Sequence, residues 1–395
     1  MKQVRCAIVG AGWWGTTAHV PALVAHPKAK LVAVQHQDPR KARQIARDFD
    51  VPHACTTLDE VLAIDGLDAA IVSSVPCAHY EQARSLLARG LHVLVEKPMT
   101  ITASEAQRLV RLAERQRVNF MISAPWHHTP HSIEAQRLVR SGALGELKMI
   151  SILMTNFTVG LYRGLPWERL FSSRPNLQNA AQPYLKPGRT AYCDASVSGG
   201  GQSYCQLPHC AGYVAYLTGR RPVEVFARFD NDGADVDIYD AINFKLDDGT
   251  LVSLATHGAT MFSERHYETR IYGTRGMILQ ELWKGTMEYH DKDCNITKYP
   301  PLPEADIYPF LEPANNLVDA VLGSAPNRSP ASYGALAMEV IDAAVRSARS
   351  GKNIRLRRVA DAKSPPVKGH PAPRAARSKR AHRGKSTRIK RTQMK

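Results

Sequence analysis

The stretch VRCAIVGAGWWG, residues 4–15, decides the fold of this chain. Its apolar first half, from about residue 3 to residue 9, is typical of a buried parallel strand, and a helix is expected over residues 16–25. Strand, GxGxxG turn and helix in this order form the fingerprint of a dinucleotide-binding site. The glycines allow a tight turn, close approach of a pyrophosphate, and close packing of helix on strand. They are Gly10, Gly12 and Gly15.

Two tryptophans, Trp13 and Trp14, stand inside this glycine motif. Two interpretations are equally open. Either one ring lines the nicotinamide side of the cofactor site, or both rings are packing residues. The next determinant lies about 20 residues further on, where an acid usually binds the adenosine ribose. Here His36 ends the expected strand 30–35, and Asp38 comes two residues late. Asp38 could instead cap the helix that starts near Pro39. Arg40 is available for a 2′-phosphate but is not adjacent, so the choice between NAD and NADP stays open, with NAD slightly favoured.

Strands and helices alternate through the first 125 residues. This alternation predicts a doubly wound parallel sheet, a Rossmann domain over residues 1–125. The expected strands are 53–55, 68–75, 91–95 and 118–123, and the expected helices are 39–49, 57–64, 78–89 and 103–116.

One of these strands ends in a charged pair. Residues 91–95 form an apolar run, and Pro98 cannot continue a central strand. Glu96 and Lys97 therefore lie at the carboxyl end of the strand, where ligands bind in open α/β sheets. Taken alone, the pair would be interpreted as solvated surface.

The pattern changes after residue 125. Strands in succession, separated by tight turns, predict a second domain over residues 126–360 with a large, open, mainly antiparallel sheet. A long segment, 158–198, interrupts them and is expected to be functional or interactive. The expected strands are 146–157, 222–229, 238–246, 250–257, 267–272 and 276–283, and helices 203–218, 313–323 and 332–350 are expected to cover one sheet face.

The net charge of +16 is concentrated at one end of the chain. Residues 361–395 hold 12 of the 52 basic and one of the 36 acidic residues, which leaves +5 for the remainder. This tail lacks apolar periodicity and is predicted to be disordered. It is interpreted as a solubilising extension, with contact to nucleic acid as the alternative. There is no signal-peptide pattern, no membrane-length apolar run, and no CxxC among seven cysteines, so a cytoplasmic protein is expected.

Three further stretches carry a family resemblance: Pro76-x-x-His79, residues 88–98 ending in Glu96-Lys97-Pro98, and Gly199-Gly200-Gly201 followed by His209. With the glycine fingerprint they make the chain, over roughly residues 3–358, resemble the glucose–fructose oxidoreductase / inositol dehydrogenase (Gfo/Idh/MocA) family. The resemblance implies a Rossmann domain joined to an open-sheet α/β domain. It also implies a nicotinamide cofactor and a sugar, polyol or related substrate between the domains. A homodimer or homotetramer is expected because one sheet face should remain apolar and open.

The resemblance assigns roles residue by residue. Lys97 matches the catalytic lysine and His209 the catalytic histidine of the family. Cys205 stands where many members have an Asp, Gly212 corresponds roughly to a further Asp, and Trp126-His127 replaces an Arg before a Pro. The implied cofactor residues are Gly10, Gly12, Trp13, Trp14, Gly15, His36, Asp38, Ser74, Pro76, His79, Glu96 and Lys97, and the implied substrate residues are Lys97, Trp126, His127, Gln202, Cys205 and His209.

Elementary chemistry agrees with these roles. Oxidation of an alcohol needs a base for the hydroxyl proton, and a histidine titrates near neutrality. A lysine beside it stabilises developing alkoxide charge. Because a thiol cannot replace a carboxylate electrostatically, we hypothesise that His209 is less basic than in Asp-bearing relatives, or that another acid such as Asp194 takes over.

The leading interpretation is an NAD(P)-dependent oxidoreductase acting on CH–OH groups of a sugar or polyol. Two alternatives remain: a glycosidase that uses bound NAD for transient oxidation, and a non-catalytic regulator that binds the cofactor. No metal is expected, because the nearby histidines and cysteines match no zinc spacing. They are His127, His128, His131, Cys205, His209 and Cys210.

Overall fold

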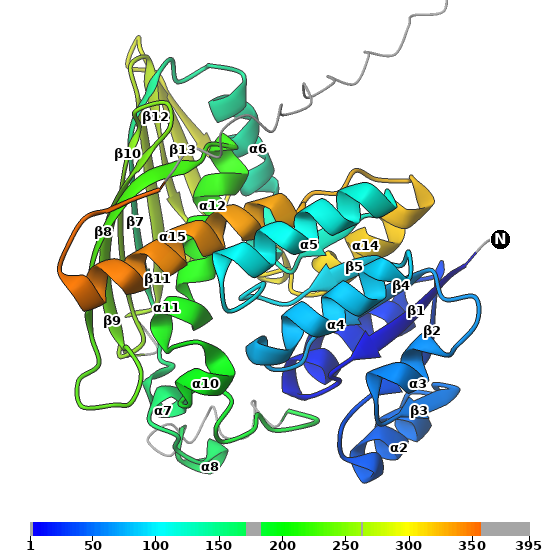
Figure 1. Ribbon diagram of the computed structural model, residues 1–395. Helices are drawn as coiled ribbons and strands as arrows, with labels where there is room; N and C mark the ends of the chain where they lie inside the picture. The colour runs from blue at the N-terminus through cyan, green and yellow to red at the C-terminus, as the bar shows by residue number, and fades with distance from the viewer. Residues whose placement is uncertain (1–2, 171–182, 262–263, 357–395) are drawn as a thin grey trace, which may run out of the picture. The chain divides into compact units, whose positions relative to one another are not determined.

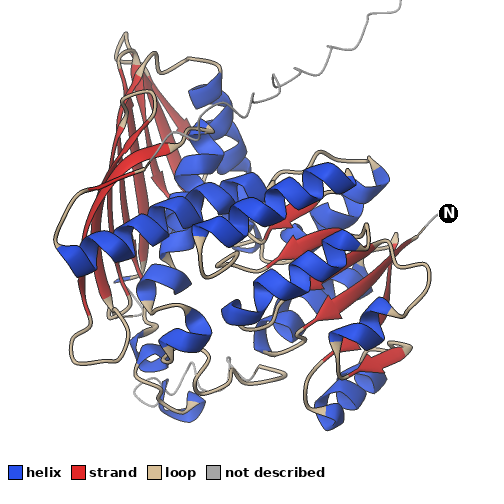
Figure 2. Cartoon of the chain, in the orientation of Figure 1, coloured by secondary structure: helices blue, strands red, loops and turns tan. Residues whose placement is uncertain are grey.

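The computed structural model describes residues 3–170, 183–261 and 264–356, which lie in one compact unit, Met1–Arg357. The predicted disordered tail, residues 361–395, falls outside the described residues. The unit is built on two sheets, each with helices packed against it (Figures 1 and 2). In the described residues no helix has the length and apolar character needed to cross a membrane.

The first sheet confirms the predicted Rossmann domain. Its six strands are all parallel, in the order β3-β2-β1-β4-β5-β6. This order reverses direction beside β1, the point where open α/β sheets bind dinucleotides. The strands are β1 Val4–Val9, β2 Ala29–Gln35, β3 His53–Cys55, β4 Ala69–Val72, β5 His92–Val95 and β6 Phe120–Ile122, and the helices are α1 Val20–Ala25, α2 Pro39–Asp48, α3 Leu58–Leu62, α4 Pro76–Ala88 and α5 Ala103–Gln116.

The glycine turn after β1 is fixed by one close approach. Gly10 has φ of +79°, and a Cβ at this position would lie 2.5 Å from the backbone of Ser74. Only glycine satisfies both constraints. The helix that follows begins at Trp13, earlier than predicted, and takes the wider π form over Gly15–His19 before α1. Such π segments are frequent at functional sites.

The second sheet has nine strands in the order β14-β13-β12-β11-β7-β10-β9-β8-β15. Every neighbouring pair is antiparallel except β7 and β10, so the predicted mainly antiparallel sheet is confirmed. The prediction missed its three outermost strands, which are short or rich in polar residues. The strands are β7 Leu147–Thr155, β8 Pro222–Asp230, β9 Tyr239–Leu246, β10 Leu251–His257, β11 His266–Gly273, β12 Gly276–Glu281, β13 Thr286–Asp291, β14 Ile296–Tyr299 and β15 Ile354–Arg355.

The helices depart from the prediction in two places. The expected helix 203–218 is broken at Gln206 into α11 (Gln202–Cys205) and α12 (Leu207–Thr218), with Pro208 in the first turn of α12. The expected helix 313–323 exists as α14 (Glu312–Leu322) but packs against β1, β4 and β5 of the first sheet, not against the second. The apolar face of α14 fits the Rossmann core, and the sequence pattern does not say which sheet receives it.

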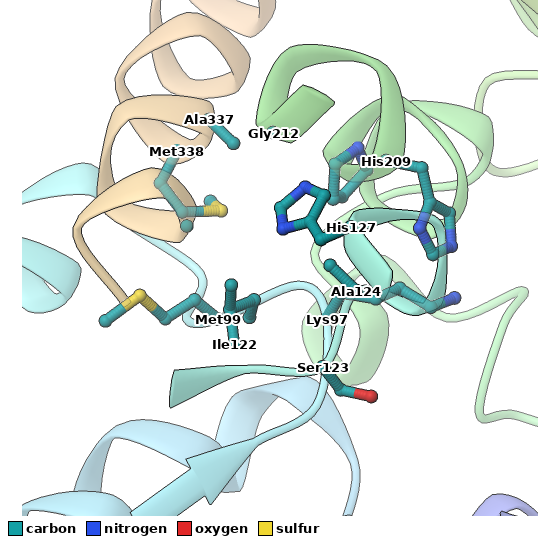
Figure 3. A pocket seen from close by; sticks show the side chains of 12 residues that line it. Lys97, Met99, Ile122, Ser123, Ala124, His127, His209, Gly212, Ala337 and Met338 are labelled. Atoms are coloured by element: carbon teal, nitrogen blue, oxygen red, sulfur yellow. The ribbon is translucent and has the colours of Figure 1, made fainter. Parts of the chain in front are cut away.

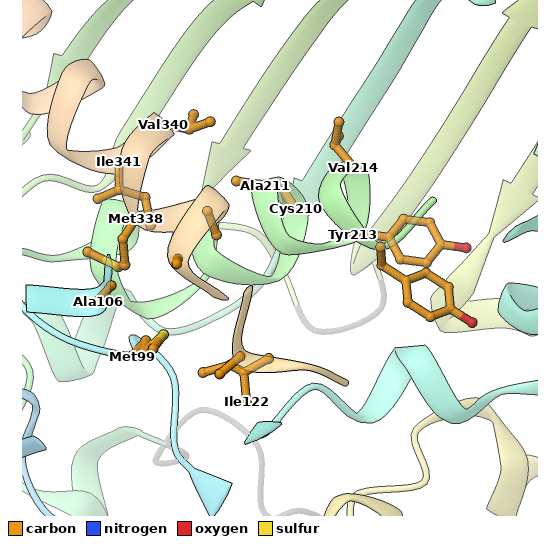
Figure 4. Close-up of a cluster of buried hydrophobic side chains, with 14 of the residues drawn as sticks. Met99, Ala106, Ile122, Cys210, Ala211, Tyr213, Val214, Met338, Val340 and Ile341 are labelled. Carbon is orange, nitrogen blue, oxygen red and sulfur yellow. The ribbon is translucent and has the colours of Figure 1, made fainter. Parts of the chain in front are cut away.

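The second sheet is covered on one face by α15 (Ala331–Ser350) and α12. Between these helices and the first sheet lies a continuous apolar core that includes Met99, Ile122 and Met338 (Figure 4). The opposite sheet face carries partly exposed apolar side chains, at Met149, Leu153 and Leu251 among others. The remaining helices are η2 Pro125–His128, α6 Pro130–Arg140, α7 Val159–Tyr162, α8 Trp167–Leu170, α10 Ala195–Ser198, η4 Leu282–Lys284 and α13 Glu304–Ile307.

Candidate active site

A cleft of about 430 Å³ opens where the carboxyl ends of β4 and β5 face the second domain. The first domain contributes Trp13 and Trp14 of the glycine motif and the loops after these strands. The second domain contributes η2, residues within 156–167 and 191–200, α11, α12, and Arg265, Trp283 and Tyr308. The predicted site residues that line the cleft are Trp13, Trp14, Ser74, Pro76, Glu96, Lys97, Trp126, Cys205 and His209.

Lys97 and His209 meet in this cleft although they come from different domains. Lys97 follows β5, and its Nζ donates a 3.0 Å hydrogen bond to the carbonyl oxygen of Cys205. The carbonyl of Cys205, not its thiol, is therefore the group that holds the lysine. The ring of His209 on α12 packs edge-on against Trp126, with centroids 5.0 Å apart.

His209 is held neutral by its surroundings. Burial, then the charges of Lys97 and His127, keeps the pKa of His209 well below its usual value. A neutral imidazole can accept a proton, and the lowered pKa supports the hypothesis of a weakly basic His209. The main chain of His209 is anchored by Tyr267, whose hydroxyl donates to its carbonyl oxygen at 3.0 Å.

His127, predicted to touch substrate, lies behind His209 and does not line the main cleft. Its Nδ1 is 2.8 Å from Ser329 Oγ, and its ring stacks on Tyr216 with centroids 4.3 Å apart. Lys97, His127 and His209 border a second, smaller cavity of about 20 Å³, which has room for one water molecule (Figure 3). Gly212, the position of a possible Asp, lines this small cavity.

The triple glycine before His209 is fixed by an acid that the sequence interpretation missed. Asp237 accepts hydrogen bonds from the backbone N–H of Gly201 and from both the N–H and the hydroxyl of Ser203. A Cβ on Gly201 would lie 2.0 Å from the carbonyl oxygen of Asp237. Gln202 is buried and supports the same turn, because it accepts from Tyr162 Oη and donates to Thr256 Oγ1.

Asp194, considered as a replacement for the missing acid, serves another purpose. Its side chain is partly exposed and caps α10 by accepting from the N–H and hydroxyl of Ser196. Asp194 therefore does not take the place left by Cys205. The thiol of Cys205 accepts a weak bond from Gln206 Nε2 at 3.4 Å.

The cofactor side fits a dinucleotide on three observations. A Cβ on Gly12 would meet nothing closer than Gly10 O at 3.9 Å, so open space faces the turn. The hydroxyl of Ser73, which lines the cleft, is buried and finds no partner among the described residues. The turn itself is held from below by Gln35, whose Oε1 accepts from Gly10 N at 2.9 Å. The space beside the Gly12 backbone and the unpaired hydroxyl of Ser73 are suited to binding a pyrophosphate.

Glu96 has a partner that the sequence interpretation missed, His19 on the π segment. Glu96 Oε1 lies 2.9 Å from His19 Nε2, both side chains are buried, and Glu96 Oε2 accepts from Lys97 N. Burial by itself would raise the pKa of Glu96, but the His19 hydrogen bond and the Lys97 charge hold that pKa below its usual value. The glycine-motif helix is thereby tied to the strand end that carries Lys97.

Six predicted cofactor residues are not among those that line the cleft: the turn glycines Gly10, Gly12 and Gly15, and the side chains of His36, Asp38 and His79. Asp38 caps α2 by accepting from Arg40 N at 2.9 Å, and His36 Nδ1 accepts from Asp38 N at 2.9 Å. His79 is buried, with its ring nitrogens 2.8 Å from Pro98 O and 3.1 Å from Ser74 O. His79 thus ties the loops after β4 and β5 together.

Trp13 and Trp14 both line the cleft and both pack against aromatic rings of the second domain. Trp13 lies edge-on to Trp167, with centroids 5.2 Å apart, and Trp14 contacts Tyr308 and Phe310. The two interpretations of the pair are therefore compatible. Among the described residues, no group of three His, Cys, Asp or Glu side chains is arranged to hold a metal ion.

The parallel sheet, its glycine turn and the open second sheet define a two-domain oxidoreductase with an NAD-binding fold. A family model described as "Oxidoreductase family, NAD-binding Rossmann fold" matches residues 4–124, and the "GFO/IDH/MocA C-terminal domain" matches residues 172–279. The chain belongs to the Gfo/Idh/MocA family, which confirms the resemblance seen in the sequence.

Two curated relatives match the first part of the chain. An uncharacterised oxidoreductase of Synechocystis sp. is 34% identical over 150 residues, 38% of this chain and 40% of that protein. The dTDP-3,4-didehydro-2,6-dideoxy-alpha-D-glucose 3-reductase of Streptomyces antibioticus is 35% identical over 157 residues, 39% of this chain and 46% of the reductase. The matches thus span less than half of these relatives.

Solved structures share the fold over nearly the whole length. GenD2 from gentamicin A biosynthesis, in complex with NAD, aligns with a TM-score of 0.71 at 22% identity, covering 91% of this chain and 97% of GenD2. Levoglucosan dehydrogenase, in complex with NADH and levoglucosan, aligns with a TM-score of 0.73 at 16% identity, covering 90% and 100%. At these identities the likeness establishes the architecture.

Proposed function

We propose that the protein is an NAD(P)-dependent oxidoreductase acting on a CH–OH or carbonyl group of a sugar, polyol or sugar derivative. The observation that carries this proposal is the meeting of Lys97 and His209 in one cleft beside the glycine turn. The names of two relatives support the substrate class: the dTDP-sugar 3-reductase and an NADP-dependent D-xylose 1-dehydrogenase of Haloarcula marismortui.

The two side chains divide the proton chemistry. When bound, NAD or NADP supplies the hydride acceptor. In the oxidation direction, a ring nitrogen of neutral His209 takes the hydroxyl proton, while Lys97 Nζ donates a hydrogen bond to the same substrate oxygen. In the reduction direction His209 returns the proton. Gly10, Gly12, Gly15 and Ser73 would hold the pyrophosphate, and the aromatic rings exclude water from the reacting centre.

Cofactor choice and assembly follow from the same geometry. Because Asp38 is engaged as a helix cap, neither it nor His36 gives a strong preference, and we propose NAD with NADP as the alternative. We propose a cytoplasmic homodimer or homotetramer formed through the open face of the nine-stranded sheet, where Met149, Leu153 and Leu251 are partly exposed.

The proposal is tested by adding NAD or NADP and a panel of sugars to the full-length protein and following NADH or NADPH formation. Lys97→Met should lower kcat by about 10³-fold and leave the cofactor Kd within about threefold, because Lys97 acts mainly on the transition state. Lys148→Met, at an exposed lysine paired with Glu146, is the matched control. Sugar release without net NADH would indicate a glycosidase, and an unchanged kcat in Lys97→Met would refute the catalytic assignment.

A further inference from the structure

His19 is a buried histidine to which the proposed reaction gives no role. Its ring nitrogen Nε2 lies 2.9 Å from Glu96 Oε1, and the other ring nitrogen, Nδ1, is buried without a partner among the described residues. Because Glu96 is ionised, the shared proton lies on the ring and Nε2 donates it. An apolar residue here would avoid the cost of an unpaired nitrogen. The hydrogen bond to Glu96 is therefore what a histidine supplies at this position.

The π segment Gly15–His19 fixes the direction of this side chain. At its end the N–H of Val20 donates to the carbonyl oxygen five residues back, not four. The hydroxyls of Thr16 and Thr17 each donate, at 2.8 Å, to the carbonyl oxygen four residues earlier, which supports the wider turn. An α-helix turns by about 100° per residue, so a wider turn changes the face on which the next side chains lie. The local sequence thus directs His19 toward the end of β5.

Glu96 connects His19 to Lys97 through its two oxygens. Oε1 accepts from the ring, and Oε2 accepts from the backbone N–H of Lys97 at 3.1 Å. At the far end of the same lysine, Nζ donates to the carbonyl oxygen of Cys205 at 3.0 Å. Lys97 is therefore held at both ends, its backbone by Glu96 and its ammonium group by the second domain. The Glu96 end is fixed only while the carboxylate is ionised and held in place.

The ionised form of Glu96 depends on its surroundings. Burial raises the pKa of Glu96, whereas the His19 hydrogen bond, the charge of Lys97 and the hydroxyl of Ser123 lower it. The other titratable groups that act on Glu96 are His79 on α4, Tyr192 and Tyr308. Burial lowers the pKa of this histidine and raises the pKa of both tyrosines, so all three are neutral near pH 7. None of them replaces His19.

We propose that His19 is a positioning residue for the reaction, which acts through Glu96 to fix the backbone of Lys97 so that its Nζ meets the reacting oxygen. This inference rests on the proposed function and adds a residue to its site. A displacement of about 1 Å at a reacting centre costs about 100-fold in rate, so a contact outside the reacting atoms can control kcat. The helix that follows the glycine turn thereby also aligns the catalytic lysine.

The experiment compares His19→Leu with His19→Gln in the full-length protein, using NAD or NADP with D-glucose, D-galactose, D-xylose and myo-inositol. Leucine fills the space without a donor, whereas the amide of glutamine retains an N–H that can reach Glu96. For the sugar that is turned over, His19→Leu should lower kcat by about tenfold or more at pH 7 and leave KM and the Kd for NADH within about threefold. His19→Gln should keep kcat within about threefold.

Two pH profiles distinguish positioning from support of the fold. Without the N–H of His19 the pKa of Glu96 rises, because burial is less opposed, and protonation removes the acceptor of the Lys97 N–H. The ratio of wild-type kcat to His19→Leu kcat should therefore increase from pH 9 to pH 5 and stay flat for His19→Gln. Urea unfolding needs no substrate: the gap between the midpoints of wild type and His19→Leu should narrow from pH 8 to pH 5, because protonation relieves the unpaired carboxylate.

His26→Leu is the matched control and should change neither kcat nor its pH profile. His26 caps the end of α1, its Nε2 lies 3.8 Å from Asp319, and neither residue lines the cleft.

The inference is overturned if His19→Leu and His19→Gln lose kcat equally, or if the Kd for NADH weakens in step with kcat. In those cases the remaining turnover would leave the proposed function standing. If NADH binds but no sugar is turned over, the urea measurement decides, and a gap that does not narrow overturns the inference. By contrast, absence of NADH binding and of turnover with every sugar would overturn the proposed function and this inference with it.

Discussion

The two sides of the cleft are built in different ways. The cofactor side comes from one domain, and its recognition elements are a glycine turn, a buried hydroxyl and strand ends that follow each other in the chain. The substrate side is assembled from separate segments, which bring Trp126, His209, Arg265, Trp283 and Tyr308 together. Binding of the cofactor by backbone atoms requires glycines at fixed spacing in the sequence. Binding of the substrate by side chains requires only that the fold bring residues from separate segments together.

The sides also differ in electrostatics. On the cofactor side a buried carboxylate, Glu96, is stabilised by His19 and Lys97. On and behind the substrate side, burial lowers the pKa of His127, His128 and His209, so these histidines are neutral near pH 7. The stability contributed by Glu96 on the cofactor side is therefore lost only at low pH. The stability contributed by the neutral histidines on the substrate side already falls as the pH drops below neutrality.

The largest effect is expected from removing the base on the substrate side. His209→Asn should lower kcat by about 10³-fold, because the hydroxyl proton loses its acceptor, while the cofactor Kd stays within about threefold. Steady-state kinetics and calorimetric titration with NAD measure the two effects. His53→Asn, at an exposed position on β3, is the control. A parallel loss of cofactor affinity would show that the two sides are not separable.

The second prediction concerns a substitution on the cofactor side that should weaken cofactor binding. Gly12→Val should raise the Kd for NAD at least about 100-fold with little change in Tm, because the new side chain enters the open space facing the turn. Gly10→Ala should instead lower the unfolding free energy by about 1–3 kcal/mol, owing to its positive φ and the contact with Ser74. Equal loss of stability in both variants would contradict this division of roles.

Stability against pH should separate the two sides. Burial, then the charge of Arg328, lowers the pKa of His128 to about 3. Because the unfolded chain binds the proton first, stability should fall as pH drops below about 6.5, by about 2 kcal/mol between pH 7 and pH 5 for this residue. Glu96, whose pKa is lowered, keeps its contribution until pH falls below its usual value of 4.5.

Urea unfolding at pH 7 and at pH 5 measures this difference. His128→Gln should remove about 2 kcal/mol of the pH-dependent loss, whereas His53→Gln, at an exposed histidine, should leave it unchanged. If both variants kept the full loss, protonation of other buried groups would have to account for it.

The smallest effect concerns the contact that joins the two sides, Trp13 against Trp167. A double-mutant cycle with Trp13→Leu and Trp167→Leu should give a coupling of about 1 kcal/mol, because edge-to-face rings attract beyond their buried area. Pairing Trp13→Leu with Tyr299→Leu, which lies against His131, should give additive effects. Additivity in the first cycle would mean that the rings do not link the two sides.

Much of the fold was predictable because its signals are local. Apolar runs ending in glycine or proline located β1 and β5, and the capping residues Thr57 and Thr102 begin α3 and α5 as such residues do. The outer strands β13 and β14 were missed because strands at a sheet edge are only partly buried. Such strands do not need a clear alternation of apolar and polar residues. The helix α14 packs against the first sheet. Its sequence pattern predicts an apolar face but does not indicate which of the two sheets that face packs against.

The candidate site was predictable to the same degree. Lys97 and His209 belong to recognisable motifs, but Asp237 and Arg265 stand in stretches without a motif. A signal for His19 did exist, since a histidine on the first helix after a glycine fingerprint lies near the neighbouring strand ends.

By itself, the sequence determined the Rossmann sheet, the glycine turn and the charged pair Glu96-Lys97, because each depends on residues within a few positions of one another. Only the tertiary structure decided that Lys97 is held by the carbonyl of Cys205, that Glu96 is paired with His19, and that Arg265 stacks on Trp283 in the same cleft. Those contacts join distant segments, and the packing of two sheets and their helices, not any local pattern, fixes which side chains meet.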